Sequence, residues 1–250
     1  MKIIFSRKGF DSGAGGFPSP IFNGVPISLP IPTQRRSVTT YDHLGLGEIV
    51  HGVTKGRLTG GSLCHHDPMF EAGRCAFGQT GAAQAHLQNN GVSVGDVFIF
   101  FGLFSESGRS DRHHRIFGYL RVEKIFAIGA APGEDMQPPG FTRPHPHIIG
   151  DWNANNSLYV GVGRTAKHAS NGLRLSRAGD GVSRWRVPAW LRSTGLTYHR
   201  RPDRWDDDET LNVVGRGQEF ITDISGNSEA AAWLEETIRD IDGEMRASPR

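Results

Sequence analysis

The sequence predicts an α+β fold: a strand-rich mixed sheet, or a partly open barrel, with a few peripheral helices. Glycine and proline supply 33 and 14 of the 250 residues, which implies many turns and short elements rather than a helical bundle. Two long segments, residues 95–104 and 115–129, are also patterned as strands. The length suits a single domain, residues 1–250, with a weak boundary near residues 130–150.

The first half of the chain is expected to form four strands and one helix. Residues 2–5 open the sheet, and residues 26–32 form an edge, since proline cannot donate to a central ladder. Residues 80–91 (TGAAQAHLQNNG) predict a helix that threonine can cap and Asn-Gly ends. The apolar run at residues 95–104 predicts a strand buried on both faces. Residues 115–129 alternate and predict its partner.

The second half is expected to alternate short strands and helices. Strands are predicted at residues 156–163, 172–177 and 218–224, a short helix at residues 188–193, and an amphipathic helix at residues 228–245. No segment resembles a membrane span, and the charged start is too short for a signal peptide. Two cysteines make no disulfide framework. We therefore expect a soluble cytoplasmic protein with no membrane partner.

Positive charge is concentrated in one segment although the net charge is only +2. Residues 164–204 hold ten Lys or Arg against two acids, a local excess of eight, and Trp185 lies between Arg184 and Arg186. Cations that meet phosphates, beside rings that stack on bases, are typical of a nucleic-acid-binding face. The alternative is a solvated surface whose arginines pair with the acidic residues 206–209. The sequence leaves both open.

The glycine-rich segment SRKGFDSGAGGFPSP (residues 6–20) does not match a nucleotide-binding loop. Lys8 precedes the glycines, whereas a P-loop needs its lysine after them. The dinucleotide fingerprint fails as well, because proline prevents a helix from starting there. The sequence therefore specifies no nucleotide cofactor, and the cofactor stays unknown.

Cysteine and histidine residues suggest a zinc site only weakly. Cys64-His65-His66-Asp67 is followed by Cys75 and His86, but no tight C-x-x-C knuckle occurs. We therefore expect no structural zinc and name no metal ligand. His145 and His147, in RPHPH, form either a ligand pair or, as we favour, an extended proline-rich turn.

Two clusters of polar residues lie beside glycines, where a ligand can approach the backbone. One is Gln79 and Gln84, at the start of the helix predicted for residues 80–91. The other is Arg216, Gln218 and Glu219, in VGRGQEF. Glutamine can read a base edge through two hydrogen bonds. The alternative for the second cluster is a tight turn before a strand. We expect residues 6–11 and 216–219 to meet in one pocket.

The helix at residues 80–91 and the two strands after it resemble the barrels of the PUA/ASCH/EVE superfamily. The shared features are the "G-D-[apolar run]-F-F" strand, a polar hairpin and an "[apolar]-x-G-x-[apolar]-x-V" strand. The resemblance implies binding of RNA or of modified or flipped DNA bases. On that basis Phe101 is a candidate stacking ring.

A set of motifs in fixed order resembles the nucleotide-modification-associated domain 3 family, from residue 1 to about residue 234. The motifs are SRKGFDSxAGGxPSPI, SLPIP, CHxDP, FGQxGAAQxHL, GDxFxFFG, HPH and GRGQEF. The resemblance implies a phage or bacterial protein associated with DNA base hypermodification. It makes residues 6–20 a substrate-facing loop in which Arg7 and Lys8 meet phosphate and Asp11 meets sugar or base. His66 departs from the pattern, which has an apolar residue there.

Two functions follow from this resemblance. The first is an enzyme that modifies a base or nucleotide, with Asp11, His65, Asp67 and Glu219 as acid/base groups. The second is a reader that binds a modified or flipped base and recruits other DNA-modification enzymes. Either way the partner is DNA or a nucleotide. A closed pocket that gathers Asp11, His65 and Glu219 would favour the enzyme, and an open aromatic groove would favour the reader.

Overall fold

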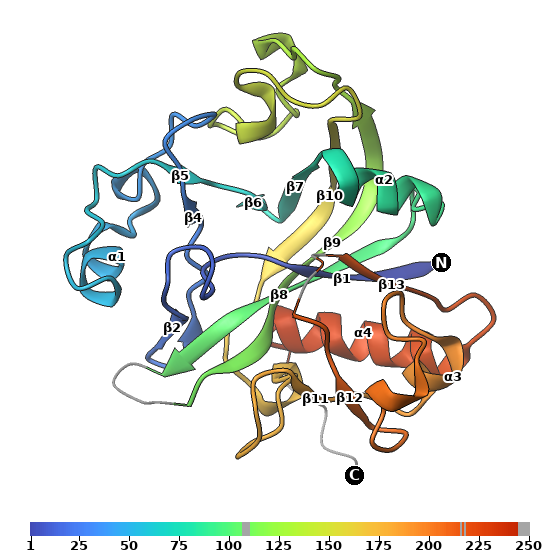
Figure 1. The fold of residues 1–250 in the computed structure, drawn as a ribbon. Helices are drawn as coiled ribbons and strands as arrows, with labels where there is room; N and C mark the ends of the chain where they lie inside the picture. Colours follow the sequence, from blue (N-terminus) through green and yellow to red (C-terminus); the bar gives the residue numbers. More distant parts are fainter. Residues whose placement is uncertain (107–110, 216, 218, 245–250) are drawn as a thin grey trace.

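The computed structural model describes residues 1–106, 111–215, 217 and 219–244. Within these residues, four α-helices surround a mixed 9-stranded sheet, and two 2-stranded sheets lie outside it (Figure 1). The order of the large sheet, β13-β1-β8-β9-β10-β7-β6, runs from one edge to the other without closing into a barrel. The α+β prediction is confirmed in its mixed-sheet form.

The large sheet combines two parallel pairings with an otherwise antiparallel order. Strand β8 pairs in parallel with both β1 and β2, whereas β9, β10, β7 and β6 follow one another antiparallel. In sheet order its strands are β13 (Glu219–Asp223), β1 (Lys2–Arg7), β8 (Val97–Glu106), β9 (His113–Ala127), β10 (Ser157–Thr165), β7 (Arg74–Gln79) and β6 (Met69–Glu71), with β2 (Ser19–Phe22) and β3 (Val25–Pro26) beside β8.

Strand β8 separates the two largest hydrophobic clusters of the core. Its first nine residues are buried, as the apolar run predicted. Because side chains alternate along a strand, Ile99 and Phe101 join the cluster that holds Trp185, while Phe98 and Phe100 pack on the other face. The sheet is therefore covered on both sides around its central strands.

The four described helices differ in how their ends are capped. The four helices are α1 (Gly47–Val53), α2 (Gly81–Asn89), α3 (Trp190–Thr194) and α4 (Ser228–Asp242). Helix α4 starts at Asn227, whose side chain accepts a hydrogen bond from the Ala230 amide, and it buries Leu234 against the cluster that holds Trp185. Thr80 makes no capping bond at α2. The side chain of Asn155 instead accepts from the Gly81 amide.

Two small sheets complete the fold, and one predicted strand is wrong. Strand β4 (Ile31–Pro32) pairs with β5 (Cys64–His65), and β11 (Arg184–Arg186) pairs with β12 (Thr210–Asn212). The strand predicted at residues 172–177 is a 3-10 turn followed by isolated bridges. The amides of Leu175 and Ser176 both donate to the His114 carbonyl, so no ladder can extend. Among the described helices, none has the length and apolarity needed to cross a bilayer.

Histidine burial should make the stability of the fold depend on pH. His114 is buried in β9, and its Nδ1 accepts a hydrogen bond of 2.9 Å from the Trp185 indole. Burial, with the nearby charges of Arg7 and His113, lowers the pKa of His114 to about 3. An unfolded histidine has a pKa near 6.5, so below that pH the unfolded chain takes up a proton that the folded chain refuses. Stability should therefore fall with falling pH between about 6.5 and 3.

Replacing His114 with asparagine should reduce this pH dependence. The asparagine amide oxygen can take the place of Nδ1 as acceptor but does not titrate. The free energy of unfolding should then fall less steeply below pH 6.5, by up to about 1.4 kcal/mol per pH unit. Urea denaturation at several pH values measures the slope, and exposed His168→Asn is the matched control. An unchanged slope in His114→Asn would contradict the prediction.

Candidate functional site

The end of strand β1 brings the N-terminal loop against the C-terminal part of the sheet. Strand β1 pairs antiparallel with β13, and Ser6 lies opposite Glu219 in the register. The next residue, Arg7, donates hydrogen bonds to the carbonyl groups of Val214 and Gly215. The two distant segments therefore meet as predicted. Arg216 and Gln218, named from the same motif, lie outside the described residues.

A buried ion pair joins these segments to strand β7. The Lys8 ammonium lies 3.1 Å from Oε1 of Glu219, with side chains that are 12% and 1% exposed. The same oxygen accepts a 2.7 Å hydrogen bond from the side-chain amide of Gln79. Lys8 also lies over the Phe77 ring, 4.4 Å from its centroid. Glu219 thus holds Lys8 and Gln79 in place and does not itself face the cavity.

Strand β5 and the residues after it present His65 and Asp67 on one side. Strand β5 ends at His65, and the Asp67 amide donates a 2.9 Å hydrogen bond to the His65 carbonyl in a tight turn centred on His66. The Asp67 carboxylate is 4% exposed, and its Oδ1 accepts a 3.0 Å hydrogen bond from the Gly78 amide. Its other oxygen, Oδ2, lies 3.7 Å from Nε2 of His65. The carboxylate is therefore fixed between β5 and β7.

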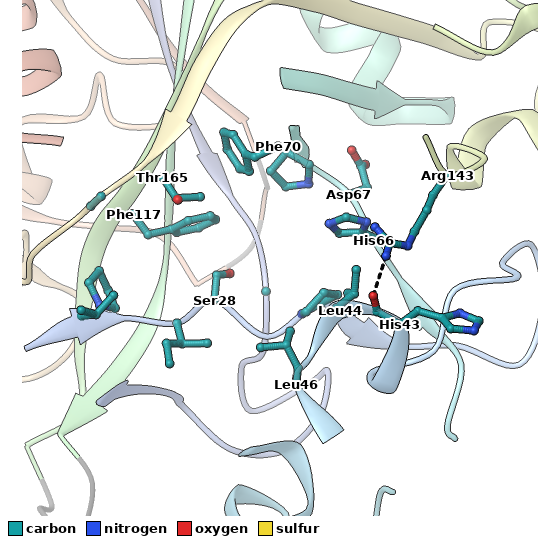
Figure 2. A pocket seen from close by; sticks show the side chains of 17 residues that line it. Ser28, His43, Leu44, Leu46, His66, Asp67, Phe70, Phe117, Arg143 and Thr165 are labelled. Carbon is teal, nitrogen blue, oxygen red and sulfur yellow. Dashed lines mark hydrogen bonds between the residues drawn. The ribbon is translucent and has the colours of Figure 1, made fainter. Parts of the chain in front are cut away.

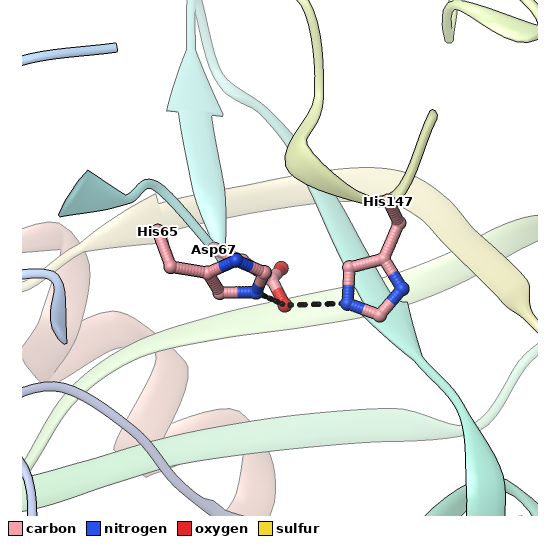
Figure 3. A group of neighbouring side chains, drawn as sticks. All are labelled: His65, Asp67 and His147. Carbon is pink, nitrogen blue, oxygen red and sulfur yellow. Dashed lines mark ion pairs between the residues drawn. The ribbon is translucent and has the colours of Figure 1, made fainter. Parts of the chain in front are cut away.

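The proline-rich turn at residues 145–147 adds two imidazole rings from a third segment. Nε2 of His145 lies 3.4 Å from Oδ1 of Asp67, and Nε2 of His147 lies 3.7 Å from Oδ2 (Figure 3). Strand β7 approaches closely here because Gly78 has no side chain, and a Cβ at that position would collide with the His147 ring. His65, Asp67 and His147 are called the triad below.

The Asp67 carboxylate carries a charge despite its burial. Burial alone would raise the pKa of Asp67, but its interactions with the side chains of His145, His65 and His147 outweigh burial and hold the pKa well below the usual value. Burial in turn lowers the pKa of His147 to about 3, although Asp67 opposes the shift. The site therefore combines an ionised carboxylate with a neutral imidazole at neutral pH.

The triad lines one end of a cavity of about 540 Å³, called the triad cavity. Trp152 forms part of its wall, stacked on His147 at 4.1 Å between ring centroids and 11° between planes. The remaining polar side chains come from the β1 end and its loop and from the end of β7: Arg7, Lys8, Asp11, Gln79 and Thr80. The size lies within the range of small-molecule sites. The three ligand atoms of the triad lie within 4.8 Å of one another, so they could hold a metal ion.

A second cavity, of about 550 Å³, lies on the other side of Asp67 (Figure 2). Asp67 and Gly9 line both cavities, whereas His66 lines only the second one, called the His66 cavity. Its wall is largely apolar, with Phe70, Phe117 and leucine side chains, and Arg143 donates a 2.7 Å hydrogen bond to the His43 carbonyl beside it. The two adjacent histidines thus line different cavities, His65 the triad cavity and His66 the His66 cavity.

Six of the residues predicted from the sequence line the triad cavity, and one supports it. Asp11 uses its Oδ1 to accept hydrogen bonds from the amides of Gly13 and Ala14, which fixes its own turn. The six lining residues are Arg7, Lys8, Asp11, His65, Asp67 and Gln79, and Glu219 lies beneath Lys8. Gln84 lies apart, because its side chain is buried between Ser157 and Tyr159.

The predicted stacking rings are wrong. Phe101 and Trp185 are 0% exposed, and Trp190 is 3% exposed, because all three pack in the core beneath the sheet. Trp185 and Trp190 therefore point inward, whereas Tyr198, in the same basic segment, is 53% exposed. No base can stack on the three buried rings in this fold.

The arginines of the basic segment are partly neutralised by the acidic run that follows. Arg184 lies 2.8 Å from Asp206, and Arg192 lies 2.7 Å from Asp208. Arg186 is exposed at the same surface, beside a hollow lined by the same acidic run. These contacts agree with the alternative in which arginines and acids pair. Binding of nucleic acid at this surface stays a prediction.

The two cysteines do not come together with the histidines. Cys64 and Cys75 are free and buried in different hydrophobic clusters. The potential metal group found among the described residues consists of the triad and includes neither cysteine. The Cys-Cys-His spacing noted in the sequence is therefore not a ligand set.

The sequence patterns give no signal for Trp152 and Asn156, and they leave His147 as either a ligand or part of a proline-rich turn. The Asn156 side-chain oxygen accepts a 2.7 Å hydrogen bond from Nδ1 of His147, and the Asn156 side-chain nitrogen donates to the His147 carbonyl. The RPHPH motif was the available signal for His147, but the favoured interpretation was a turn. Both descriptions hold, since Pro146–Ile148 is a 3-10 turn that carries His147 into the site.

Replacing Glu219 alone should lower the stability of the fold more than replacing both Lys8 and Glu219. Glu219→Gln leaves a largely buried ammonium without its counter-charge, and we expect a loss of about 3 kcal/mol. Adding Lys8→Met removes that charge and keeps an apolar stem over the Phe77 ring, so the double variant should recover most of the loss. Urea denaturation measures both. Equal stabilities of the single and double variants would contradict this prediction.

Comparison with known proteins places the chain in one family. No curated protein and no solved structure matches the sequence significantly. The family model for nucleotide modification associated domain 3 matches residues 2–223, a span that contains every residue of the triad cavity described above. Helix α4 lies beyond the matched span. The resemblance of the ordered motifs is thus confirmed, and the chain belongs to the nucleotide modification associated domain 3 family.

Proposed function

We propose that this protein is an enzyme that modifies a nucleobase or nucleotide in the triad cavity, as part of a phage or bacterial DNA-hypermodification system. The observation that carries the proposal is the convergence of acid/base groups on one cavity. Asp11 lines it from the N-terminal loop, and His65 and Asp67 line it from the segment at the end of β5. Membership of a family associated with nucleotide modification supplies the class of substrate.

The cavity offers suitable partners for each part of a nucleotide. The Lys8 ammonium and the Arg7 guanidinium are cations at its wall, where they can donate to phosphate oxygens. The half-buried Trp152 ring forms part of the wall, where His147 stacks on it and the Arg36 guanidinium lies 4.2 Å from its centroid, so a base would contact the edge of this group. At the far end, a buried ionised carboxylate lies beside imidazoles, which are the groups most often used for proton transfer.

The shape of the site favours an enzyme over a reader. A reader of flipped bases needs accessible rings, but the candidates Phe101 and Trp185 are core residues, and the Trp152 ring in the cavity wall is already in contact with His147 and Arg36. A buried carboxylate is costly to maintain, so a binding module has little reason to place one against three imidazoles. We therefore assign the chemistry to the triad end of the cavity and nucleotide binding to its basic end.

Calorimetry with deoxynucleotides tests where the substrate binds. Among the four 2′-deoxynucleoside 5′-monophosphates, at least one should bind the wild type with a dissociation constant below about 1 mM. The Lys8→Met/Glu219→Gln protein lacks the ammonium, so it should bind that monophosphate at least about tenfold more weakly, since a charge-assisted hydrogen bond contributes about 1.5–3 kcal/mol. The matching nucleoside, which has no phosphate, should bind both proteins alike.

Arg192→Ala is the matched control, because it removes a cation from a distant surface ion pair. Absence of binding by all four monophosphates would refute the nucleotide site. Equal weakening of nucleoside and monophosphate would place phosphate recognition elsewhere.

Mass spectrometry of nucleosides tests the chemistry. Nucleosides are compared between cells of the source system that express the wild type and cells that express Asp67→Asn. The asparagine keeps an acceptor for the Gly78 amide and removes the charge. We expect a modified nucleoside in the wild type and its loss in the variant. The same nucleosides in both, with nucleotide binding intact, would identify a reader.

A further inference from the structure

We propose that His65, Asp67 and His147 bind one divalent first-row transition-metal ion, iron(II) or zinc(II), with coordination positions open to the triad cavity. The inference deepens the proposed function, because the metal lies at the end of the cavity where the chemistry is placed. Two imidazoles and one carboxylate that leave open positions are the ligand set of non-haem iron(II) enzymes, and catalytic zinc uses similar sets.

The spacing of the ligand atoms suits a single ion. Both imidazole Nε2 atoms lie 3.7 Å from the same oxygen, Oδ2 of Asp67, and all three atoms lie within 4.8 Å of one another (Figure 3). Metal–ligand bonds of about 2.0–2.2 Å in tetrahedral geometry place neighbouring ligand atoms about 3.4 Å apart. Movements of a few tenths of an ångström to about one ångström, within reach of side-chain rotation, would close the three atoms around an ion.

The hydrogen bonds of His147 leave a lone pair facing the carboxylate. The Asn156 side-chain amide donates to the His147 carbonyl, so its oxygen is the atom that faces Nδ1 of His147 at 2.7 Å. Nδ1 therefore carries the proton, and Nε2 of the neutral ring presents a lone pair toward Asp67. Two acceptors then face each other at 3.7 Å, a distance too long for an N–H···O hydrogen bond even with a protonated ring. A cation bound between these two acceptor atoms would attract both of them.

The surrounding groups hold the ligands in the orientation that metal sites use. Metal-binding imidazoles commonly donate their other N–H to an oxygen, as His147 does to Asn156. The two oxygens of Asp67 have different partners. Oδ1 accepts a hydrogen bond from the Gly78 amide, and Oδ2 faces the two triad imidazoles. His145 lies at the Oδ1 side, and its Nδ1 accepts from the His147 amide, so it is a positioning residue rather than a ligand.

An ion in this place would be accessible to substrate. His65, Asp67 and His147 all line the triad cavity, together with Lys8 and Gln79. Three protein ligands leave at least one tetrahedral position for water or a substrate atom, which is typical of catalytic rather than structural sites. The proposal departs from the expectation drawn from the sequence, which named no metal ligand and favoured a proline-rich turn for His145 and His147. Stoichiometric zinc in purified protein would also contradict the expectation that no structural zinc binds.

Metal titration of the full chain tests the inference. The protein is stripped with a chelator and titrated, in the absence of oxygen, with iron(II), cobalt(II) or zinc(II), while calorimetry gives stoichiometry and affinity. We expect one ion per chain. His65→Ala and His147→Ala should each weaken binding at least about a hundredfold, and Asn156→Ala about tenfold to a hundredfold through loss of ligand orientation. Elemental analysis of protein purified without chelator distinguishes iron from zinc.

The neighbouring histidine provides the matched control. His66→Ala removes the same group from the adjacent position, but it faces the His66 cavity and should leave affinity and stoichiometry unchanged. Circular dichroism checks that each variant is folded, and His65→Asn supplies a smaller polar change if an alanine variant unfolds. Failure of the wild type to bind any of the three ions would overturn the inference, and so would equal binding by the triad variants.

The outcome is separable from that of the proposed function. Metal binding by a protein that binds no deoxynucleotide would uphold the metal site and refute the substrate. Deoxynucleotide binding by a protein that binds none of the three ions would do the reverse.

Discussion

The buried charge of Asp67 is the constraint on which the site depends. A carboxylate taken out of water costs several kcal/mol, so its neighbours must supply hydrogen bonds and positive charge. These neighbours come from three separate segments: the amide of Gly78 in β7, the imidazole of His65 in β5, and the rings of the turn at residues 145–147. The three segments must therefore pack around the Asp67 carboxylate for the fold to be stable. The same closure assembles the triad, so stability and chemistry share one requirement.

Strand β1 connects this group to the opposite end of the cavity. Strand β1 lies between β8 and β13, and β13 is the edge strand. The residues that follow β1 therefore leave the sheet beside Glu219. Lys8 is then held by Glu219, and Glu219 also accepts from Gln79, the last residue of β7. Strand β7 carries Gly78 as well, which binds Asp67. Two neighbouring residues of one strand thus fix the basic end and the acidic end of the cavity relative to each other.

Local patterns allowed much of the fold to be predicted, but not the contacts that make the site. The apolar run of β8 and the amphipathic pattern of α4 depend on neighbours in sequence, so both were foreseen. His147 lies 80 positions after Asp67, and no periodicity indicates that contact. The error at Trp185 has the opposite origin: its arginine neighbours are exposed or half-buried, but alternation along β11 turns the ring into the core. A residue's neighbours in sequence describe its strand, whereas its function depends on which face it occupies.

The adjacent residues His65 and His66 illustrate that point. His65 and His66 have the same chemistry, yet only the first can reach Oδ2 of Asp67, because the second points into the His66 cavity. Burial, aided by the charge of His145, lowers the pKa of His66 to about 4 against the pull of Asp67. Its Nδ1 has no hydrogen-bond partner, so the ring is a neutral polar group in a largely apolar wall. An apolar residue could fill that position without disturbing the triad. The tight turn after β5, rather than residue type, therefore decides which histidine belongs to the site.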